Sequence, residues 1–314
     1  DRFVEEDLGL RLDPRDMYTS RAAGDLDDDG DVDLVVAGNI RFDRTRIDPM
    51  CGDACAGKVA LHDAIPSLLL RRESDGSYTE AAAVLAPDLA LDETTLVVAI
   101  TDLDADGRVD IYVGNDLGER FHDRALIRDG FGVYRDEQLE TGLGHNAMGY
   151  GVDTMGFSTA DVDGNGILDH VATSFARDAT ALWLCGDDRF CEPQAPDRSG
   201  TEALSLSFRW GAALVDLDLD GRPDLVEATG HIESDEALAD DPMQTRDQRP
   251  NAMWNAGGRF VAVEAAETDA RATPRSTRGI AVTDLDEDGR PDIVLAPAAG
   301  AHSAFFYGYF RLWQ

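Results

Sequence analysis

Five segments of the chain carry oxygen-bearing side chains at one repeated spacing. Each has Asp or Asn at positions 1, 3 and 5, Gly at position 6 and Asp at position 9. The segments are residues 25–33, 102–110, 161–169, 216–224 and 284–292. A tight turn at the glycine can gather these oxygens, together with the main-chain carbonyl of position 7, around one hard cation. Because calcium accepts roughly six to eight oxygens in flexible geometry, the spacing predicts about five calcium ions.

The predicted metal ligands occupy positions 1, 3, 5, 7 and 9 of each segment, where position 7 contributes only its carbonyl. They are Asp25, Asp27, Asp29, Asp31, Asp33, Asp102, Asp104, Asp106, Arg108, Asp110, Asp161, Asp163, Asn165, Ile167, Asp169, Asp216, Asp218, Asp220, Arg222, Asp224, Asp284, Asp286, Asp288, Arg290 and Asp292.

The segments do not follow the helical calcium loop of EF-hands. That loop needs a bidentate Glu at position 12 and a helix on each side. Position 12 is apolar in four segments, and only the fourth has an acid there, Glu227. The flanking runs are short and rich in β-branched and aromatic residues, which is typical of strands. We therefore expect hairpins in which a calcium turn joins two strands.

The rest of each unit predicts the fold. After each of the first four hairpins a third and a fourth β-rich run follow, and four antiparallel strands make one propeller blade. The sequence thus predicts an all-β chain with a single β-propeller domain over residues 1–314. The segments begin 77, 59, 55 and 68 residues apart, which favours five blades. Seven blades, two of them without calcium and hidden in the longer spacings, are the alternative.

The two ends of the chain predict how the ring closes. Residues 305–313 supply a third run for the last unit, and no fourth run follows them. Residues 2–9 resemble the fourth runs of other units, such as residues 259–264. We expect the N-terminal strand to complete the last blade, because a closed ring leaves no open strand edge.

Three stretches carry a resemblance to a known family: residues 210–231, 248–251 and 276–284. They resemble FG-GAP/VCBS repeats, the propeller repeats of integrin α-subunits, and more narrowly the cartilage acidic protein and UnbV-like group. The resemblance covers nearly the whole chain. It implies a secreted, calcium-loaded propeller with a role in adhesion or ligand binding.

Charge and hydropathy exclude several classes of partner. The chain has 62 Asp and Glu against 28 Lys and Arg, a formal charge of −34. Such a surface repels phosphate, so we expect no nucleic-acid partner. No run approaches the roughly 18 apolar residues of a membrane span, so no membrane insertion is expected. The N-terminus lacks a signal peptide, so the chain is either cytosolic or a mature exported form.

The four cysteines form two close pairs, Cys51 with Cys55 and Cys185 with Cys191. Two local disulfides are favoured, with free thiols or a four-thiolate zinc site as alternatives. Disulfides would place the protein outside the cytosol, in the periplasm or the extracellular space.

Two polar residues interrupt apolar positions of the repeat. His170 follows the last Asp of the third segment, where the other four units have Leu or Ile. We expect a hydrogen-bonded core histidine there, with a functional histidine as the alternative. Glu227 replaces an apolar residue in the fourth unit. It is interpreted as an additional calcium ligand, a satisfied structural carboxylate, or a functional acid or base.

Three histidines stand in loops at strand ends: His145, His231 and His302. If these loops converge, the histidines and Glu227 would form a site for acid–base chemistry or for a further, transition metal. This is the basis of the enzyme hypothesis, a lyase, hydrolase or cyclase acting at the propeller axis. Solvated surface histidines are the alternative, so the sequence leaves open whether the chain is an enzyme.

A second candidate site lies at the starts of the first strands. Arg21, Arg209, Trp210 and Arg278 would form a basic and aromatic pocket for an anionic or sugar-like ligand. The alternative is that Trp210 packs between blades while the arginines pair with nearby Asp. The favoured function is a binding or adhesion module for an extracellular protein, a glycan or a small molecule.

Overall fold

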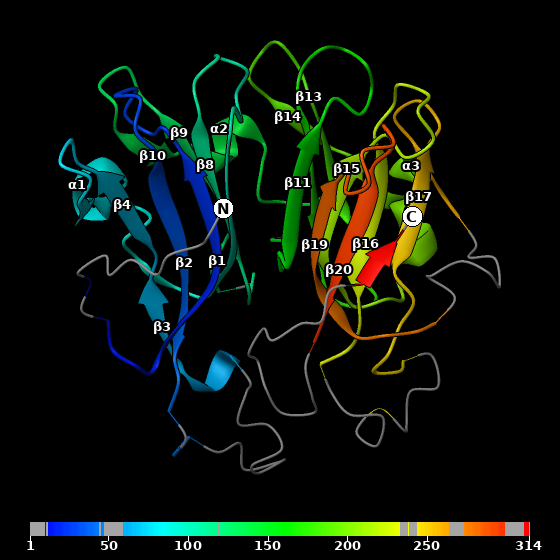
Figure 1. The fold of residues 1–314 in the computed structure, drawn as a ribbon, viewed down its shortest axis with the longest axis horizontal. Helices are drawn as coiled ribbons and strands as arrows, with labels where there is room; N and C mark the ends of the chain where they lie inside the picture. The colour runs from blue at the N-terminus through cyan, green and yellow to red at the C-terminus, as the bar shows by residue number, and fades with distance from the viewer. Residues whose placement is uncertain are drawn as a thin grey trace. The chain divides into compact units, whose positions relative to one another are not determined.

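The computed structural model describes residue 10 and residues 12–43, 45–46, 59–118, 120–232, 238, 244–263, 273–298 and 311–313. Regular structure in these ranges is mainly β-strand, which confirms the predicted all-β class (Figure 1). The α-helices are single turns: α1 (Ala82–Leu85), α2 (Gln138–Thr141) and α3 (Pro196–Ser199). No helix in the described part of the chain is long and apolar enough to span a membrane.

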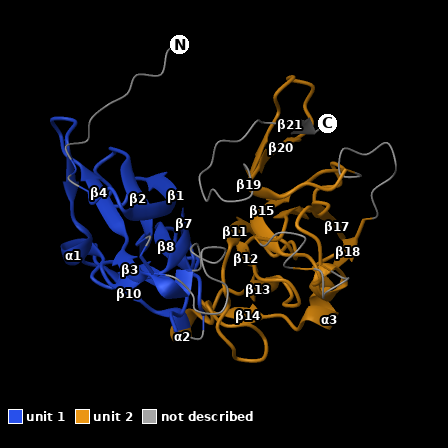
Figure 2. Ribbon diagram, turned by 90° about the horizontal axis from the view of Figure 1, so that it is seen from below, with its two compact units in different colours: residues 1–138 blue, residues 139–314 orange. Residues whose placement is uncertain are grey.

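The chain divides into two compact units, residues 1–138 and residues 139–314 (Figure 2). Each unit is built from antiparallel sheets. The prediction of one domain over residues 1–314 stays a prediction.

The first unit contains two sheets. The first sheet has β1 (Asp16–Gly24), β2 (Asp33–Arg41), β4 (Leu68–Arg72) and β5 (Tyr78–Glu80), paired in that order. The sequence did not predict two further short strands, β3 (Asp63–Pro66) and β6 (Asp92–Glu93). β3 pairs with the C-terminal end of β2, and β6 pairs with β3. The second sheet has β7 (Thr95–Thr101), β8 (Asp110–Asn115), β9 (Arg124–Arg128) and β10 (Tyr134–Asp136).

The second unit contains three sheets. The third sheet has β11 (Gly156–Ala160), β12 (Asp169–Thr173), β13 (Ala181–Cys185) and β14 (Cys191–Pro193). The fourth has β15 (Arg209–Val215), β16 (Asp224–Thr229), β17 (Asn251–Asn255) and β18 (Phe260–Ala262). The fifth has β19 (Thr277–Thr283), β20 (Asp292–Pro297) and β21 (Arg311–Trp313).

Every sheet begins with a hairpin that holds one of the five acidic segments at its tip. This confirms the predicted strand–turn–strand units and excludes flanking helices. The predicted third and fourth runs also form strands, and β14 begins only at Cys191, after the turn that contains Arg189. Arg189 has a φ of 68°. A residue in this left-handed conformation belongs to a turn and cannot continue a strand.

The core of each unit lies between neighbouring sheets. Leu26, Val35 and Leu69 from the first sheet pack in one cluster with Ile111 and Leu126 from the second. Burying each of these side chains contributes about 1.5–3 kcal/mol. Leu26 is position 2 of the first acidic segment, so that loop is anchored in the core.

The second unit repeats this arrangement. Val162, position 2 of the third segment, packs with Leu182 of the third sheet and with Leu225, Met253 and Phe260 of the fourth. An apolar side chain at position 2 therefore fixes the base of a loop between two sheets.

The first strands of neighbouring sheets lie side by side within each unit: β1 beside β7, and β15 between β11 and β19. Glycines permit this approach in the second unit. A Cβ on Gly156 would lie 2.3 Å from the carbonyl oxygen of Trp210, and one on Gly211 would lie 2.9 Å from that of Arg278. Larger residues would push these strands apart.

The last sheet agrees with part of the predicted closure, because β21 pairs with β20 as the expected third strand. Residues 2–9, predicted to complete this sheet, lie outside the described residues.

Candidate functional site

The five acidic loops share one pattern of hydrogen bonds. In each, a carboxylate oxygen of position 1 accepts from the N–H of the glycine at position 6. The bond from Gly107 to Asp102 Oδ2 is 2.9 Å long, and that from Gly221 to Asp216 Oδ2 is 2.8 Å. Each loop is therefore closed on itself by its first and sixth residues.

The closing turn needs two left-handed residues. The glycines at position 6 have φ between 83° and 89°. Position 4 is also left-handed, with φ between 59° and 64° in four loops, where the residue is not glycine. The third loop has Gly164 at this position, with φ of 80°. The sequence pattern revealed the need for glycine at position 6, whereas it gave no signal for position 4.

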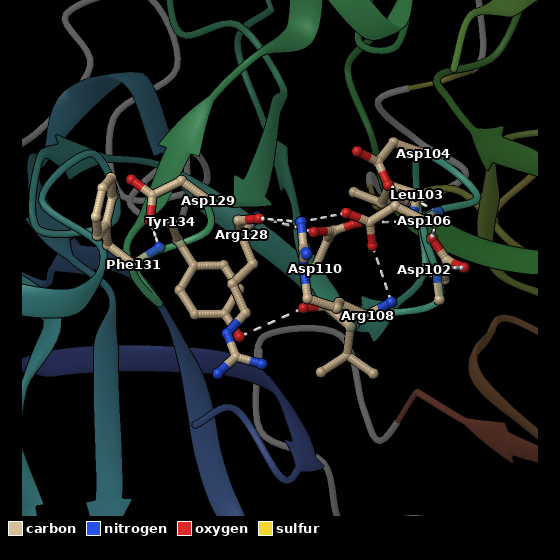
Figure 3. Close-up of polar contacts among 12 residues, drawn as sticks. Asp102, Leu103, Asp104, Asp106, Arg108, Asp110, Arg128, Asp129, Phe131 and Tyr134 are labelled. Atoms are coloured by element: carbon tan, nitrogen blue, oxygen red, sulfur yellow. Dashed lines mark hydrogen bonds and ion pairs between the residues drawn. The ribbon is translucent and has the colours of Figure 1, made fainter. Parts of the chain in front are cut away.

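The Asp at position 9 joins its loop to the third strand of the sheet. Figure 3 shows Asp110, which accepts from the N–H of Leu103 and from that of Arg128 in β9, both at 2.9 Å. Asp33, Asp169 and Asp224 accept the same pair of bonds in their sheets. These carboxyl groups are buried, and burial raises the pKa of Asp110 to about 7 and that of Asp169 to about 6.

The carboxylate oxygens of each loop converge. In four loops, three carboxylate oxygens from different residues lie within 4.8 Å of one another. The sets are Asp25, Asp27 and Asp29; Asp102, Asp104 and Asp110; Asp161, Asp163 and Asp169; and Asp216, Asp218 and Asp224. Two oxygens that bind one calcium at about 2.4 Å cannot be farther apart than about 4.8 Å. The spacing and the all-oxygen donor set fit a single hard cation in each loop.

Loop 25–33 also contains an orphaned polar atom. Oδ1 of Asp25 is buried and has no hydrogen-bond partner in the described part of the chain. A buried carboxylate oxygen without a partner is unfavourable unless a cation or a water satisfies it. This atom therefore favours a bound cation at the first loop.

Position 7 of three loops is an arginine that pairs with position 5. Arg108 pairs with Asp106, and Arg222 with Asp220. The same residues donate to the main-chain carbonyls of Arg128 and Asn255, at the ends of third strands. The pairs are partly exposed, so each contributes little to stability, but they hold the backbone at position 7 in place.

In each unit, a side chain bridges the loops of two neighbouring sheets. Tyr134 Oη donates to the carbonyls of Leu26 and Val109 at 2.8 and 3.3 Å. Asn255 Nδ2 donates to those of Val162 and Pro223 at 2.8 and 3.1 Å. In both cases the acceptors are position 2 of one loop and position 8 of the next, so the bridge links two candidate cation sites.

A cavity of about 440 Å³ lies between the third and fourth loops. It is lined by Ala160, Asp161, Val162, Asp163, Gly164, Leu214, Val215, Asp216, Gly221, Arg222, Pro223 and Gly257. It is thus a groove between two candidate cation sites of the second unit.

Glu227 is fully buried in β16, and both its carboxylate oxygens have partners. Thr180 donates to Oε1, and Asn251 Nδ2 donates to Oε2 at 2.7 Å. These contacts match a satisfied structural carboxylate. The converging oxygens in the fourth loop belong to other residues.

The residues of the enzyme hypothesis have different surroundings. The main-chain carbonyl of His145 accepts from Trp183 Nε1 at 2.9 Å. The ring of His231 packs edge-on against Phe208, with centroids 5.0 Å apart. Glu227 is held by Thr180 and Asn251, and His302 lies outside the described residues.

Two of the four predicted ligand-binding residues come together. The guanidinium of Arg278 lies 4.1 Å from the centroid of the Trp210 ring. The ring of Phe208 stacks on Trp210, with centroids 5.2 Å apart. Arg278 also donates to the carbonyls of Gly230 and His231 at 3.1 and 3.3 Å. Burial, with a smaller effect from the charge of Arg246, lowers the pKa of Arg278 to about 10.

The other two arginines do not join this cluster. Arg209 is buried and donates to the main-chain carbonyls of Leu204, Phe175 and Asp178, while its Nε has no partner among the residues that the structure describes. Burial lowers its pKa. Arg21 is an exposed residue of β1 in the first unit.

His170 lies in the core, as predicted, but it is not hydrogen-bonded. It is fully buried in β12, and neither ring nitrogen has a partner within the described residues. Its ring stacks on Phe157 at 5.5 Å. Burial lowers the pKa of this imidazole to about 3. The prediction of a hydrogen-bonded histidine was wrong, because the ring stacks on Phe157 and lies beside the sulfurs of Cys185 and Cys191 without a hydrogen-bond partner in the described residues.

The predicted disulfide between Cys185 and Cys191 is present, and it joins directly opposite residues of β13 and β14. His170 lies beside it, with one ligand atom of each of the three residues within 4.8 Å of the others. The sequence carries no signal that His170 lies beside the two cysteines. The second pair, Cys51 and Cys55, lies outside the described residues.

No family model matches the chain, and no curated protein is similar to it. Similar solved structures include a lectin of Agrocybe aegerita that recognises non-reducing terminal N-acetylglucosamine, which is 16% identical with a TM-score of 0.48. The match covers 91% of this chain but only 61% of the lectin.

Two further structures are the biofilm matrix protein Bap1 of V. cholerae and the Dos1 propeller. Bap1 is 14% identical with a TM-score of 0.44, over 90% of this chain and 36% of Bap1. The Dos1 propeller is 8% identical with a TM-score of 0.36, over 74% and 49%. These similarities concern β-sheet architecture alone, and the resemblance to FG-GAP/VCBS repeats stays a prediction.

Proposed function

We propose that this chain is a calcium-stabilised β-propeller of five blades that works outside the cytosol as a binding module. The observation that carries the proposal is the convergence of carboxylate oxygens in the acidic loops, with the same closing hydrogen bonds in all five. Asp and Asn oxygens with a position-7 carbonyl are ligands that calcium prefers. When bound, calcium would offset two negative charges of each cluster and join position 1 to position 9.

Two observations support five blades over seven. Each of the five sheets begins with one acidic loop. The longest spacing, between the first two loops, is partly occupied by β3 and β6, which pair with the first sheet. The ring closure by residues 2–9 remains part of this proposal. The disulfide at Cys185 and Cys191 favours an oxidising compartment.

The calcium proposal is tested by titration and chelation. A calcium-free protein should bind about five ions in calorimetry. Binding at a calcium concentration of about 1,000 times Kd stabilises a fold by about 4 kcal/mol per site. Since about 1 kcal/mol corresponds to 2–4 °C in a domain of this size, excess EGTA should lower Tm by at least about 10 °C.

A matched pair of variants assigns the effect to the loops. D218N replaces a converging carboxylate of the fourth loop, at a position that is Asp in all five segments, and should remove one calcium ion from the titration. D75N changes an Asp in a turn outside the loops, where Asp75 accepts from the N–H of Ser77 at 3.0 Å, and should leave the calcium count unchanged. An unchanged melting curve in EGTA would contradict the proposal.

For the ligand we propose the partly buried pair of Trp210 and Arg278 in the second unit, which packs against the buried Phe208. An aromatic ring beside a cation suits a sugar ring that carries an acidic group, because the ring stacks and the cation attracts the charge. Arg246 adds positive charge near Arg278 in an otherwise acidic protein. We therefore propose acidic glycans as the class of ligand.

A glycan array tests this assignment with calcium-loaded protein. Acidic glycans should bind better than their neutral counterparts, and W210A should weaken the binding at least tenfold. The control is W254A, which removes an exposed tryptophan of β17 and should bind as the wild type does. Binding that W210A does not weaken, or a lack of binding to every acidic glycan, would refute the assignment while leaving the calcium proposal intact.

A further inference from the structure

Three residues of the third sheet bring together the side chains that zinc prefers. His170 of β12 is 0% exposed, Cys185 of β13 is 4% exposed and Cys191 of β14 is 1% exposed. One ligand atom from each lies within 4.8 Å of the others. They form a small cluster, His170–Cys185–Cys191, that is separate from the acidic loops.

Strand register explains why these residues meet. His170 lies opposite Trp183 on β13, and Cys185 lies two residues farther along that strand, on the same face. Cys185 lies opposite Cys191 on β14. Diagonal neighbours on one face of an antiparallel sheet are within reach of long side chains. The cluster is thus built by three adjacent strands.

The imidazole of His170 carries the inference. Both of its nitrogens are buried, and neither has a hydrogen-bond partner in the described residues. A buried polar ring without partners is unfavourable, and Leu or Ile occupies this position in the other four units. The exception occurs in the sheet that also carries the cysteine pair.

We propose that, when the Cys185–Cys191 disulfide is reduced, the two sulfurs and His170 bind one zinc ion. Two thiolates and one imidazole are a common protein ligand set for this metal. A divalent ion with two thiolates and a neutral imidazole carries no net charge, which a buried site tolerates far better than a charged one. The Asp loops have only oxygen donors, so they do not compete for a thiophilic ion.

The chemistry balances with a phosphine reductant. The S–S bond breaks, each sulfur gains a proton, and the phosphine is oxidised to its oxide with the oxygen of one water molecule. Zinc then displaces the two thiol protons, which pass to the buffer, and forms two Zn–S bonds.

The loop 161–169 lies close to this cluster through Cys185. The main-chain N–H of Cys185 donates to Asp169 at 2.8 Å, and its carbonyl accepts from Asn165 Nδ2 at 2.9 Å. The backbone of this ligand is therefore held in place by hydrogen bonds that do not depend on the disulfide. These hydrogen bonds support the expectation that the third sheet keeps the three ligands together after reduction.

Cobalt(II) tests the proposal, because its thiolate complexes absorb light and zinc displaces it. The protein carries C51S and C55S, is saturated with calcium and is reduced with a phosphine without oxygen. One cobalt ion per chain should bind with a thiolate-to-cobalt charge-transfer band, and one equivalent of zinc should abolish that band. The oxidised protein should show no band.

Variants separate the roles of the ligands. H170L introduces the residue that the first and fourth units have at this position, and it should weaken cobalt binding at least tenfold. C185S should abolish the charge-transfer band, whereas H122A, which alters an exposed histidine of the first unit, should change neither affinity nor spectrum. Circular dichroism on each reduced sample reports whether the sheets persist.

Three results would overturn the proposal. They are a folded, reduced protein without the charge-transfer band, equal cobalt affinity in H170L and the wild type, and loss of the β-sheet spectrum on reduction in the presence of calcium. The last result would mean that the three ligands are not held together in the reduced state.

Discussion

At the scale of single residues, two polar side chains occupy apolar positions of the repeat with opposite outcomes. Glu227 has donors for both oxygens, from Thr180 and Asn251. His170 has none for either nitrogen within the described chain. A satisfied buried group is nearly neutral for stability, whereas an unsatisfied one destabilises the fold by about 1–3 kcal/mol. The histidine is therefore the residue whose replacement should be favourable.

We expect H170L to raise the free energy of unfolding of the oxidised, calcium-loaded protein by about 1–3 kcal/mol at neutral pH. The difference in stability between H170L and the wild type should increase at acidic pH. Burial holds the pKa of His170 at about 3 in the folded chain, against an ordinary value of 6.5. As the pH falls below 6.5, the unfolded chain takes up a proton that the folded chain does not, so the wild type loses stability.

The measurement is urea unfolding of both proteins at about pH 7, 6 and 5. Below pH 6.5 the difference between them should widen by about 1.4 kcal/mol per pH unit. Comparing the two proteins at each pH removes the contribution of the many carboxylates that they share. Parallel pH dependences would show that the His170 imidazole has a protein or water partner.

At the scale of elements, each acidic loop is a turn held at three places. The glycine at position 6 closes it, the side chain at position 2 packs in the core in the first three loops, and the Asp at position 9 joins four of the loops to a third strand. Tyr134 and Asn255 add links between neighbouring loops. Most of these contacts use main-chain groups, so the loops have a defined shape that a cation can complete.

The turn itself can be tested in the fourth loop with two opposite changes. G221A places a side chain at φ of 89°, and its Cβ would meet no atom within 4 Å. The expected loss of about 1–2 kcal/mol is therefore due to the backbone conformation alone. L219G relieves a φ of 61° at an exposed residue and should be neutral or stabilising by less than about 1 kcal/mol.

Chemical unfolding in the presence of calcium measures the change in stability of each variant, and calorimetric titration measures its calcium binding. G221A should also weaken calcium binding at one site, because the N–H of Gly221 positions Asp216. If G221A were as stable as the wild type, the left-handed turn would not be needed for this loop.

At the scale of the whole molecule, the acidity of the chain is concentrated in the loops. Positions 1, 3, 5 and 9 hold four carboxylates in each of four loops and three in loop 161–169, which is 19 of the 62 acidic residues. Five bound dications would add ten positive charges and change the formal charge from −34 to −24. Without them, mutual repulsion among neighbouring carboxylates opposes the folded state. The large effect of EGTA predicted above follows from this concentration of charge.

The candidate ligand-binding features all lie in the second unit. Both the groove between the third and fourth loops and the Trp210–Arg278 cluster are formed by the sheets of residues 139–314. These sheets approach closely because Gly156 and Gly211 lie in their first strands. The zinc proposal depends on a single sheet of the same unit.

The sequence by itself determined the repeated hairpins and the acidic loops, and it favoured the pairing of Cys185 with Cys191. These features depend on residues close in the chain: a turn needs glycine where φ is positive, and strands show in short β-rich runs. The short strands β3 and β6 escaped prediction because they belong to no repeat and are only four and two residues long.

Only the tertiary structure decided which polar groups have partners and which candidate residues meet. Glu227 is satisfied by Thr180, 47 residues away, and Trp210 meets Arg278 across two sheets, while Arg209, its neighbour in sequence, points to other carbonyls. His170 came to lie beside a disulfide rather than a donor. Such outcomes depend on strand register and on the packing of one sheet against the next, which bring together residues whose spacing along the chain carries no signal of their contact.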